Sequence, residues 1–92
     1  MSSYKIILAD KYKEIAQRFF KKNKNLIKQY EKTLDLLKEN PYHPSLRLHK
    51  LEGRHQDFYS VSINLEYRII VSFDSENKVI IPITIGKHDD VY

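Results

Sequence analysis

The second half of the chain carries side chains of the types that cleave RNA without a metal ion. They are two histidines, a carboxylate, an arginine and a tyrosine, at His49, Glu66, Arg68, His88 and Tyr92. A base must take the proton of the attacking 2′-hydroxyl, a cation must stabilise the phosphorane, and an acid must protonate the departing 5′-oxygen. Arginine suits the cation's task because its planar guanidinium pairs with two phosphate oxygens. These five residues are therefore candidate catalytic residues.

Each candidate also has a plain structural explanation, which the sequence leaves open. Arg68 could be an exposed strand residue, Glu66 a turn carboxylate paired with it, and His49 a polar surface residue. A C-terminal tyrosine could dock on a sheet, or stack on a base as aromatic residues do with single-stranded RNA. Four more cations are scattered among the candidates and are predicted to contact RNA phosphates: Arg47, Lys50, Arg54 and Lys87.

Other site chemistries find little support in the sequence, so we expect no metal and no cofactor. The four histidines have no tight ligand spacing, the chain has no cysteine, and the tripeptide HDD at 88–90 is a weak signal for a divalent ion. Only two glycines are present, which leaves no phosphate-cradling loop. No local motif suggests a Ser-His-Asp arrangement.

Length and composition predict one modest domain over residues 1–92. The chain is 41% hydrophobic and has no cysteine, signal peptide or apolar run long enough for a membrane span, so we expect a cytoplasmic location. A net charge of +4 suits a polyanionic partner or an acidic protein. Five lysines between positions 21 and 32 indicate a solvated helix end, or a patch that grips a phosphate backbone.

The first half of the chain has the pattern of one strand followed by two helices. An apolar run, Tyr4 to Ala9, predicts the strand, and Asp10 can cap the helix that follows. Apolar residues then repeat at helical spacing to about Asn23, and again from Leu26 to about residue 38. The segment NPYHP ends the second helix. So short a connection predicts an antiparallel helical hairpin.

Beyond Pro44 the apolar residues alternate with polar ones, which predicts strands at about 46–53, 58–63, 67–73 and 78–86. Pro82 cannot donate to a sheet ladder, so the last strand should lie at an edge or carry a bulge there. The expected fold is α+β: an N-terminal strand, the two-helix hairpin, then a three- or four-stranded antiparallel sheet with both helices on one face. The opposite face, with Ser60, Ser62, Arg68 and Ser72, is the expected place for a site.

The segments LHKLEG, FYSVSINLEYRIIVSF and IGKHDDVY resemble the RelE/ParE superfamily of toxins from type II toxin–antitoxin modules. The resemblance covers nearly the whole chain and is nearest to the YafQ and YoeB branches of RelE-like mRNA endonucleases. It implies a RelE-like fold and a ribosome-dependent endoribonuclease that cuts mRNA in the A site and inhibits translation. It also implies two partners, namely the ribosome with its mRNA and an acidic antitoxin that is partly disordered until bound.

The resemblance also implies roles for individual residues. His49 falls where the YafQ branch has a functional histidine, and Glu66 matches an acidic position before the central strand. Arg68 matches an arginine of the YoeB branch, His88 the catalytic histidine near the C-terminus, and Tyr92 the terminal aromatic. Glu66 or His49 would then be the general base, Arg68 the phosphorane stabiliser, His88 the general acid, and Tyr92 would position the substrate.

One departure from the pattern keeps other functions open. Ser62 stands where the YafQ branch has a second histidine. The main alternative is a ParE-like inhibitor that binds DNA gyrase and has no nuclease activity, although a pure binder does not require Glu66, Arg68 and His88 together. A basic nucleic-acid-binding domain without catalysis is the third possibility.

Overall fold

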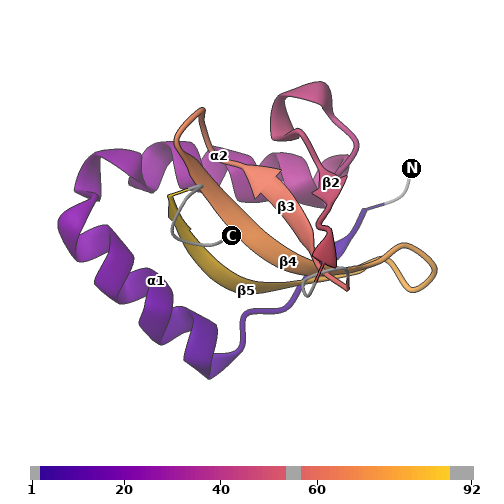
Figure 1. The fold of residues 1–92 in the computed structure, drawn as a ribbon, viewed down its shortest axis with the longest axis horizontal. Coiled ribbons are helices and arrows are strands. Elements are labelled where there is room, and N and C mark those ends of the chain that lie inside the picture. Colours follow the sequence, from indigo (N-terminus) through magenta and orange to yellow (C-terminus); the bar gives the residue numbers. More distant parts are fainter. Residues whose placement is uncertain (1–2, 54–56, 88–92) are drawn as a thin grey trace.

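The computed structural model describes residues 3–53 and 57–87 (Figure 1). Its helices are α1 (Asp10–Lys22) and α2 (Ile27–Glu39), with short 3₁₀ helices η1 (Lys24–Leu26) and η2 (Pro44–Leu46). Its strands are β1 (Lys5–Ile6), β2 (His49–Lys50), β3 (Tyr59–Ser62), β4 (Tyr67–Asp74) and β5 (Val79–Lys87). None of the helices in the part described is long and apolar enough to cross a membrane.

The described strands form one mixed sheet in the order β1-β5-β4-β3-β2. Strands β2 to β5 pair antiparallel, as expected for the C-terminal sheet, and β1 adds a fifth strand that runs parallel to β5. Both helices lie on one face of this sheet, and α2 passes behind the strands in Figure 1. The α+β class, the element order and the placement of the helices are therefore confirmed.

Pro82 lies in β5, which is an interior strand between β1 and β4, at a register shift that is one of the two structural allowances for a strand proline. The ladder between β4 and β5 shifts register between Ile70 and Val71, so Val71 pairs with Pro82 while Ile70 pairs with Thr84. On the other side of β5, the hydrogen bond from Ile7 N to Ile80 O is the last one that the N-terminal strand makes in the described segments. Pro82 therefore sits at a bulge and has no ladder donor to supply.

The two helices reverse direction at Asn23 and open from there as a V (Figure 1). Asn23 Nδ2 donates to the Phe19 carbonyl at 2.9 Å and so closes the end of α1. Its Oδ1 accepts from the Tyr67 hydroxyl at 3.3 Å, which ties this corner to β4. At the start of α1, Ala9 is the cap residue and Asp10 is the first helical residue, so the capping role expected for Asp10 is wrong.

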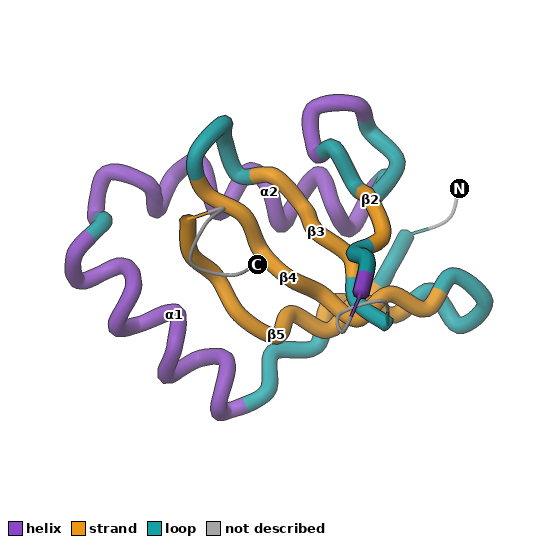
Figure 2. Tube along the Cα trace, in the orientation of Figure 1, coloured by secondary structure: helices purple, strands orange, loops and turns teal. Residues whose placement is uncertain are grey.

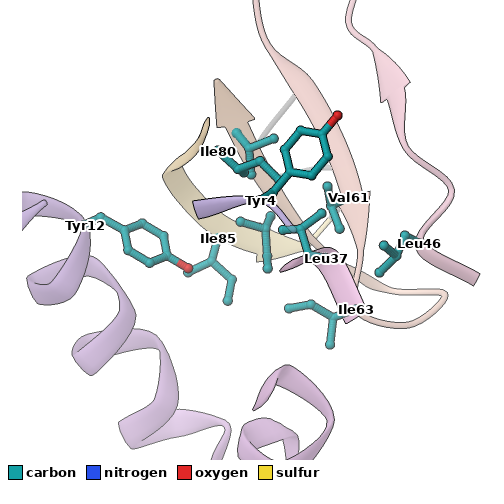
Figure 3. Close-up of a cluster of buried hydrophobic side chains, with 10 residues drawn as sticks. Tyr4, Tyr12, Leu37, Leu46, Val61, Ile63, Ile80 and Ile85 are labelled. Atoms are coloured by element: carbon teal, nitrogen blue, oxygen red, sulfur yellow. The ribbon is translucent and has the colours of Figure 1, made fainter. Parts of the chain in front are cut away.

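The core fills the space between the helices and the facing side of the sheet (Figure 3). Its buried members come from α1, α2, η2 and the strands, and Tyr12 reaches from α1 toward Ile85 in β5. Val61, Ile69 and Val71 have no exposed surface, as the alternating pattern predicted for the helix-facing side. Apolar burial of this extent is the main driving force for the fold.

The segment before β3 differs from the strand expected over residues 46–53. Residues 44–46 form η2, with Pro44 at its start, and Arg47 then adopts a left-handed conformation with φ of 48°. Leu46 is buried in a helical turn and not in a strand. Only His49 and Lys50 pair with β3, because extended backbone begins after the turn at Arg47.

Candidate functional site

The face of the sheet turned away from the helices carries two rows of facing residues. In the first row His49 pairs with Ser60, Ser60 with Ile70, and Ile70 with Thr84. In the second row, one pleat away, Ser62 pairs with Arg68 and Arg68 with Gly86. Side chains at successive paired positions of a row point to the same side of a sheet. His49 and Arg68 are therefore on one face, as predicted.

Arg68 is the candidate that the fold holds most firmly. It is the second residue of β4, a strand in the central part of the sheet, and its side chain is half-buried. Its Nε is fully buried, while Gly86 leaves the neighbouring position on β5 without a side chain. A guanidinium that is partly withdrawn from water attracts an anion more strongly than one on an open surface. Arg68 is suited to hold a phosphate at this face.

His49 is exposed on the edge strand, and its ring orientation is fixed by the backbone. The ring Nδ1 lies 3.0 Å from the Arg47 carbonyl oxygen. A carbonyl can only accept, so Nδ1 carries the hydrogen and the neutral ring has its lone pair on Nε2. The left-handed turn at Arg47 places that carbonyl beside the ring. In this tautomer Nε2 is the ring atom that can accept a hydrogen bond or a proton.

Glu66 lies in the tight turn between β3 and β4, at one end of the sheet (Figure 2). Asn64 organises this turn, since its Oδ1 accepts from the backbone N–H of Glu66 at 2.9 Å and of Tyr67 at 2.8 Å. The Glu66 side chain is exposed and precedes β4 by one residue, so sheet alternation does not fix its direction. Glu66 is near Arg68 in the chain but less firmly positioned.

The predicted RNA-contacting cations within the described residues do not all lie on the face of His49 and Arg68. Lys50 pairs with Tyr59, and Lys87 pairs with Tyr67, whose ring contacts Phe19 of α1. By alternation both lysines stand on the opposite side from His49 and Arg68, although both are exposed at strand ends. Arg47 is exposed at a hollow of about 430 Å³ between η2 and the β3–β4 turn.

Three predicted site residues lie outside the described residues: Arg54, His88 and Tyr92. They stay predictions of the sequence. Within 3–53 and 57–87, no group of three or more histidine and carboxylate side chains is arranged to hold a metal ion.

The face carrying these rows is less open than its polar sequence suggested. Ser60 has no exposed surface, Ser62 is 5% exposed and Ile70 is 4% exposed. The Ser62 hydroxyl donates to the Asn64 carbonyl at 2.6 Å, so it serves the turn. Alternation predicted the side on which Ser60 and Ser62 stand, but it carries no signal for their burial. Sequence reasoning also gave no role to Ile70, which lines the centre of this face.

Comparison with known proteins shows which solved structures share this fold. No family model matches the chain. Its fold is that of YafQ from E. coli, with a TM-score of 0.77 at 12% identity, over 97% of this chain and 98% of that one. It is also that of YoeB in the YoeB–YefM complex from Staphylococcus aureus, with a TM-score of 0.69 at 22% identity, over 95% of this chain and 99% of that one.

The sequence itself is similar to a protein of Methanocaldococcus jannaschii named "Putative toxin RelE4". The two are 27% identical over 89 residues, which span 97% of this chain and 90% of the relative. The resemblance to the RelE/ParE superfamily, with a YafQ- and YoeB-like fold, is confirmed.

Proposed function

We propose that this protein is the toxin of a type II toxin–antitoxin system and acts in the cytoplasm as a ribosome-dependent, metal-independent mRNA endoribonuclease. Residues 1–92 would form its single RelE-like domain. The similarity to "Putative toxin RelE4" and the YafQ- and YoeB-like fold support the toxin assignment. Cleavage of mRNA is the finer part of the proposal and rests on the arrangement of the sheet face.

One observation carries the nuclease part, namely the common face of Arg68 and His49. They stand two strands and two residues apart, a Cα separation of roughly 12 Å at ordinary sheet spacings. Two long side chains at that separation can reach a phosphate and its adjoining ribose together. Arg68 would then stabilise the phosphorane, while His49 through Nε2, or Glu66, would remove the 2′-hydroxyl proton.

The remaining steps fall to residues of the C-terminal segment. His88 would protonate the departing 5′-oxygen, and Tyr92 would position or stack the substrate. Arg47, Lys50, Arg54 and Lys87 would contact RNA phosphates. These assignments rest on the residue types and on the resemblance.

An antitoxin is the expected protein partner. Structures with this fold include the E. coli DinJ–YafQ toxin–antitoxin complex and the RelBE2 toxin–antitoxin complex from Mycobacterium tuberculosis. A net charge of +4 suits an acidic antitoxin that orders on binding. Growth arrest on expression, reversed by a small protein encoded beside this one, is the expected genetic behaviour.

The decisive experiment is mRNA cleavage on programmed ribosomes, mapped by primer extension for the wild type, Arg68→Ala and His88→Ala. We expect discrete A-site cuts by the wild type and loss of about 10²-fold or more in each variant. Absence of cleavage by folded wild-type protein would contradict the proposal. It would favour the ParE-like alternative, which a gyrase supercoiling assay tests directly.

Two further readouts test the metal-free mechanism. Attack by the 2′-hydroxyl leaves a cyclic phosphate or phosphate at the new 3′ end, and it does not need a divalent ion at the protein. We expect toxin that has been treated with EDTA, and freed of the chelator before it is mixed with ribosomes, to cleave mRNA as fast as untreated toxin does. New ends that carry a 3′-hydroxyl would contradict attack by the 2′-hydroxyl.

A further inference from the structure

A hollow of about 430 Å³ lies at the edge of β3, between η2 and the β3–β4 turn, which rise at the same end of the sheet (Figure 1). It is lined by Pro44, Ser45, Arg47, Ser62, Asn64 and Leu65. A second hollow of about 260 Å³ shares Ser45 and Ser62 with the first and continues it toward α2. Of the residues that line the first hollow, the proposed cleavage mechanism uses only Arg47, as a phosphate contact.

The hollow adjoins the candidate RNA face. Ser62 pairs with Arg68, and the next residue of the chain, Ile63, donates its backbone N–H to the Tyr67 carbonyl. Because hydrogen-bonded and non-hydrogen-bonded pairs alternate along an antiparallel ladder, Ser62 and Arg68 form a non-hydrogen-bonded pair with Cα atoms roughly 4.5 Å apart. A phosphate held by Arg68 would therefore lie about one strand away from the hollow, which is within the reach of one nucleotide.

The main chain of Ser62 offers a donor and an acceptor at the hollow. By the same alternation its N–H and C=O point away from β4, to the side where β2 pairs with Ser60. The strand β2 begins only at His49, and within the described segments no backbone hydrogen bond joins Ser62 to η2 or to Arg47. Main-chain groups that are withdrawn from water require partners, so this pair favours a ligand that has both an acceptor and a donor.

Ser45 adds a second acceptor to the hollow. Its backbone N–H donates to His43 Nδ1 at 3.2 Å, so that ring nitrogen carries a lone pair. The Ser45 hydroxyl lies 2.9 Å from the same nitrogen and must therefore donate its hydrogen there. Its oxygen lone pairs remain to accept from a ligand. Two acceptors do not suit an anion, which accepts hydrogen bonds and donates none.

The walls of the hollow are partly apolar, and one of them is fixed by hydrogen bonds. Leu65 in the turn is 74% exposed and Pro44 in η2 is exposed, so each flanking element contributes apolar surface. The Ser62 hydroxyl donates to the Asn64 carbonyl, and Asn64 Oδ1 accepts from two backbone N–H groups of the turn. Apolar walls with a few fixed polar groups are typical of a site for a small planar ligand.

We propose that this hollow binds one base of the mRNA, that of a nucleotide next to the phosphate at Arg68, and that it discriminates among bases. The inference rests on the proposed function, which supplies the RNA. The base would pack its faces against Pro44 and Leu65 and turn its Watson–Crick edge to the main chain of Ser62. Arg47 would keep its role as a phosphate contact.

The main chain of Ser62 would divide the bases into two pairs. The Watson–Crick edges of adenine and cytosine place an exocyclic donor beside a ring acceptor, whereas those of guanine and uracil place an exocyclic acceptor beside a ring donor. One fixed N–H and C=O match only one of these orders when the sugar and phosphate orient the base. The other order leaves polar groups unpaired, which lowers affinity by about tenfold.

Other occupants match the hollow less well. A β-strand of another protein needs a run of free edge groups, but β2 already pairs with Ser60, and the chain bends from Ile63 onward, which leaves those of Ser62. A free phosphate would use Arg47 but would meet the acceptors of Ser45 and Ser62. A base satisfies the donor, the acceptors and the apolar walls together.

Chemical-shift mapping by NMR tests the hollow without the ribosome. The probes are AMP, CMP, GMP and UMP, each titrated into isotope-labelled protein, with inorganic phosphate as the reference. We expect the amide signals of Ser45, Ser62 and Leu65 to shift with nucleotides and not with phosphate. Either AMP and CMP or GMP and UMP should bind about tenfold more tightly than the other two. Equal binding by all four, or no shift at these amides, would overturn the inference.

Substitutions in the walls locate the base. Ser45→Phe fills the hollow at an exposed position, and Ser75→Phe, at an exposed serine of the β4–β5 turn, is its matched control. We expect Ser45→Phe to weaken the favoured nucleotides by about tenfold and to bind phosphate like the wild type. Leu65→Ser removes an apolar wall outside the core and should weaken them by about threefold, whereas Leu8→Ser should not. Wild-type nucleotide binding by Ser45→Phe or by Leu65→Ser would overturn the inference.

Cleavage on programmed ribosomes connects the hollow to the reaction. The four bases are placed in turn at each position of the A-site codon, and we expect one pair of bases at one position to be cleaved about tenfold faster. Ser45→Phe should erase this preference, whereas Arg68→Ala should slow the cleavage of all codons alike. Cleavage by Ser45→Phe with an unchanged preference would overturn the inference and leave the proposed function standing. Absence of cleavage by the wild type, with the nucleotide shifts in place, would contradict the proposed function and leave the base site standing.

Discussion

The guanidinium of Arg68 has a planar geometry that a lysine side chain cannot reproduce. Its guanidinium can donate two parallel hydrogen bonds to a phosphate, whereas a lysine ammonium offers a compact charge. We predict that Arg68→Lys lowers single-turnover mRNA cleavage on programmed ribosomes by about 10-fold to 100-fold, less than Arg68→Ala does. Arg18→Lys, at an exposed arginine of α1, is the control and should cleave at the wild-type rate. Wild-type cleavage by Arg68→Lys would show that only charge is needed.

Ser60 and Ser62 are neighbours on one face of β3, yet their hydroxyls have different environments. The Ser62 hydroxyl donates to the Asn64 carbonyl at 2.6 Å, whereas Ser60 Oγ is fully buried and has no hydrogen-bond partner in the part of the chain that is described. Removing a bonded hydroxyl costs about 1 kcal/mol. Removing a buried hydroxyl without a partner loses no hydrogen bond and ends its desolvation penalty.

We therefore predict opposite effects for the two alanine substitutions. Ser62→Ala should lower the free energy of unfolding by about 1 kcal/mol, and Ser60→Ala should leave it unchanged or raise it by up to about 1 kcal/mol. Urea denaturation followed by circular dichroism measures both. A loss in Ser60→Ala as large as that in Ser62→Ala would mean that the Ser60 hydroxyl has a partner, such as a buried water.

At the scale of elements, the contact between Tyr12 and Tyr30 joins the two helices. Burial is the main reason that the pKa of each hydroxyl is raised above its usual value near 10. A raised pKa in the folded state means that this contribution to stability is complete below the unfolded value and is lost as pH rises above it. We predict that stability falls above about pH 10, and that the fall is shallower in Tyr12→Phe.

Urea unfolding at a series of alkaline pH values measures this effect. Lysines also titrate in this range, so the quantity to compare is the difference in slope between variants. Equal slopes for Tyr12→Phe and the wild type would contradict a role for Tyr12 in the alkaline loss.

The turn between β4 and β5 depends on one carboxylate. Asp74 Oδ1 accepts from the backbone N–H groups of Glu76 and Asn77, each at 3.1 Å, and its Oδ2 accepts from Asn77 Nδ2 at 2.7 Å. The bonds from Asn77 are the main reason that the pKa of Asp74 lies below its usual value. The ionised form therefore stabilises the turn above the unfolded pKa, and this is lost as pH falls through the folded one.

We predict that Asp74→Ala speeds amide hydrogen exchange at Glu76 and Asn77 near neutral pH and lowers overall stability slightly. The difference in stability from the wild type should shrink as the pH falls through the lowered pKa of Asp74 in the folded state, because the wild-type carboxyl then becomes protonated. Asp35→Ala, at an exposed carboxylate of α2, is the control. A difference that stays constant down to pH 2 would mean that the ionised form is not what stabilises the turn.

The elements that sequence reasoning predicted well are those with a long apolar repeat. Both helices and strands β3 to β5 have several turns or pleats of such a pattern, and each was expected within a few residues of its observed bounds. The segment before β2 has too few residues for a repeat. There Pro44 starts a 3₁₀ turn and Arg47 adopts positive φ, a conformation that arginine's sequence context does not signal.

The candidate site, too, could be predicted from the sequence only in part. Placing Arg68 and His49 on one face followed from alternation alone, because a strand turns successive side chains to opposite sides. The burial of Ser60 and Ile70 on that face could not be predicted, since alternation says nothing about what covers a face. An apolar groove of about 880 Å³ lies between the helices, and it could not be predicted either. Its opening depends on the angle between α1 and α2, which the apolar repeat of each helix does not determine.

At the scale of the whole molecule, the protein presents different surfaces on its two sides. The sheet side holds the candidate RNA face, where the fold holds Arg68 half-buried. The helical side holds the apolar groove. It also holds the whole net charge of +4, because residues 10–39 contain nine basic and five acidic residues and the rest of the chain contains seven of each. Charge far from a site still steers a polyanion toward the molecule, so under the proposed function the helices would assist approach to a ribosome without taking part in cleavage.

The core that separates these surfaces is continuous, which leads to a last prediction. One cluster of buried residues includes Tyr12 of α1, Leu37 of α2, and Val61, Ile69 and Ile80 of three strands. No part of the described chain has a separate core, so neither helix can leave the sheet without exposing the same cluster. We predict that residues 1–92 unfold as a single cooperative unit in urea, with one two-state transition.

The chain's tyrosines allow a stringent test, because they report from both ends of the molecule. Tyr4 stacks on Phe73 at 5.6 Å beside the β4–β5 end, whereas Tyr12 and Tyr30 lie between the helices. Within Tyr4→Phe, and likewise within Tyr12→Phe, tyrosine fluorescence and far-ultraviolet circular dichroism should give unfolding transitions with the same midpoint. The midpoint itself can differ between the two variants, because their stabilities differ. Separate midpoints within one variant would contradict a single cooperative unit.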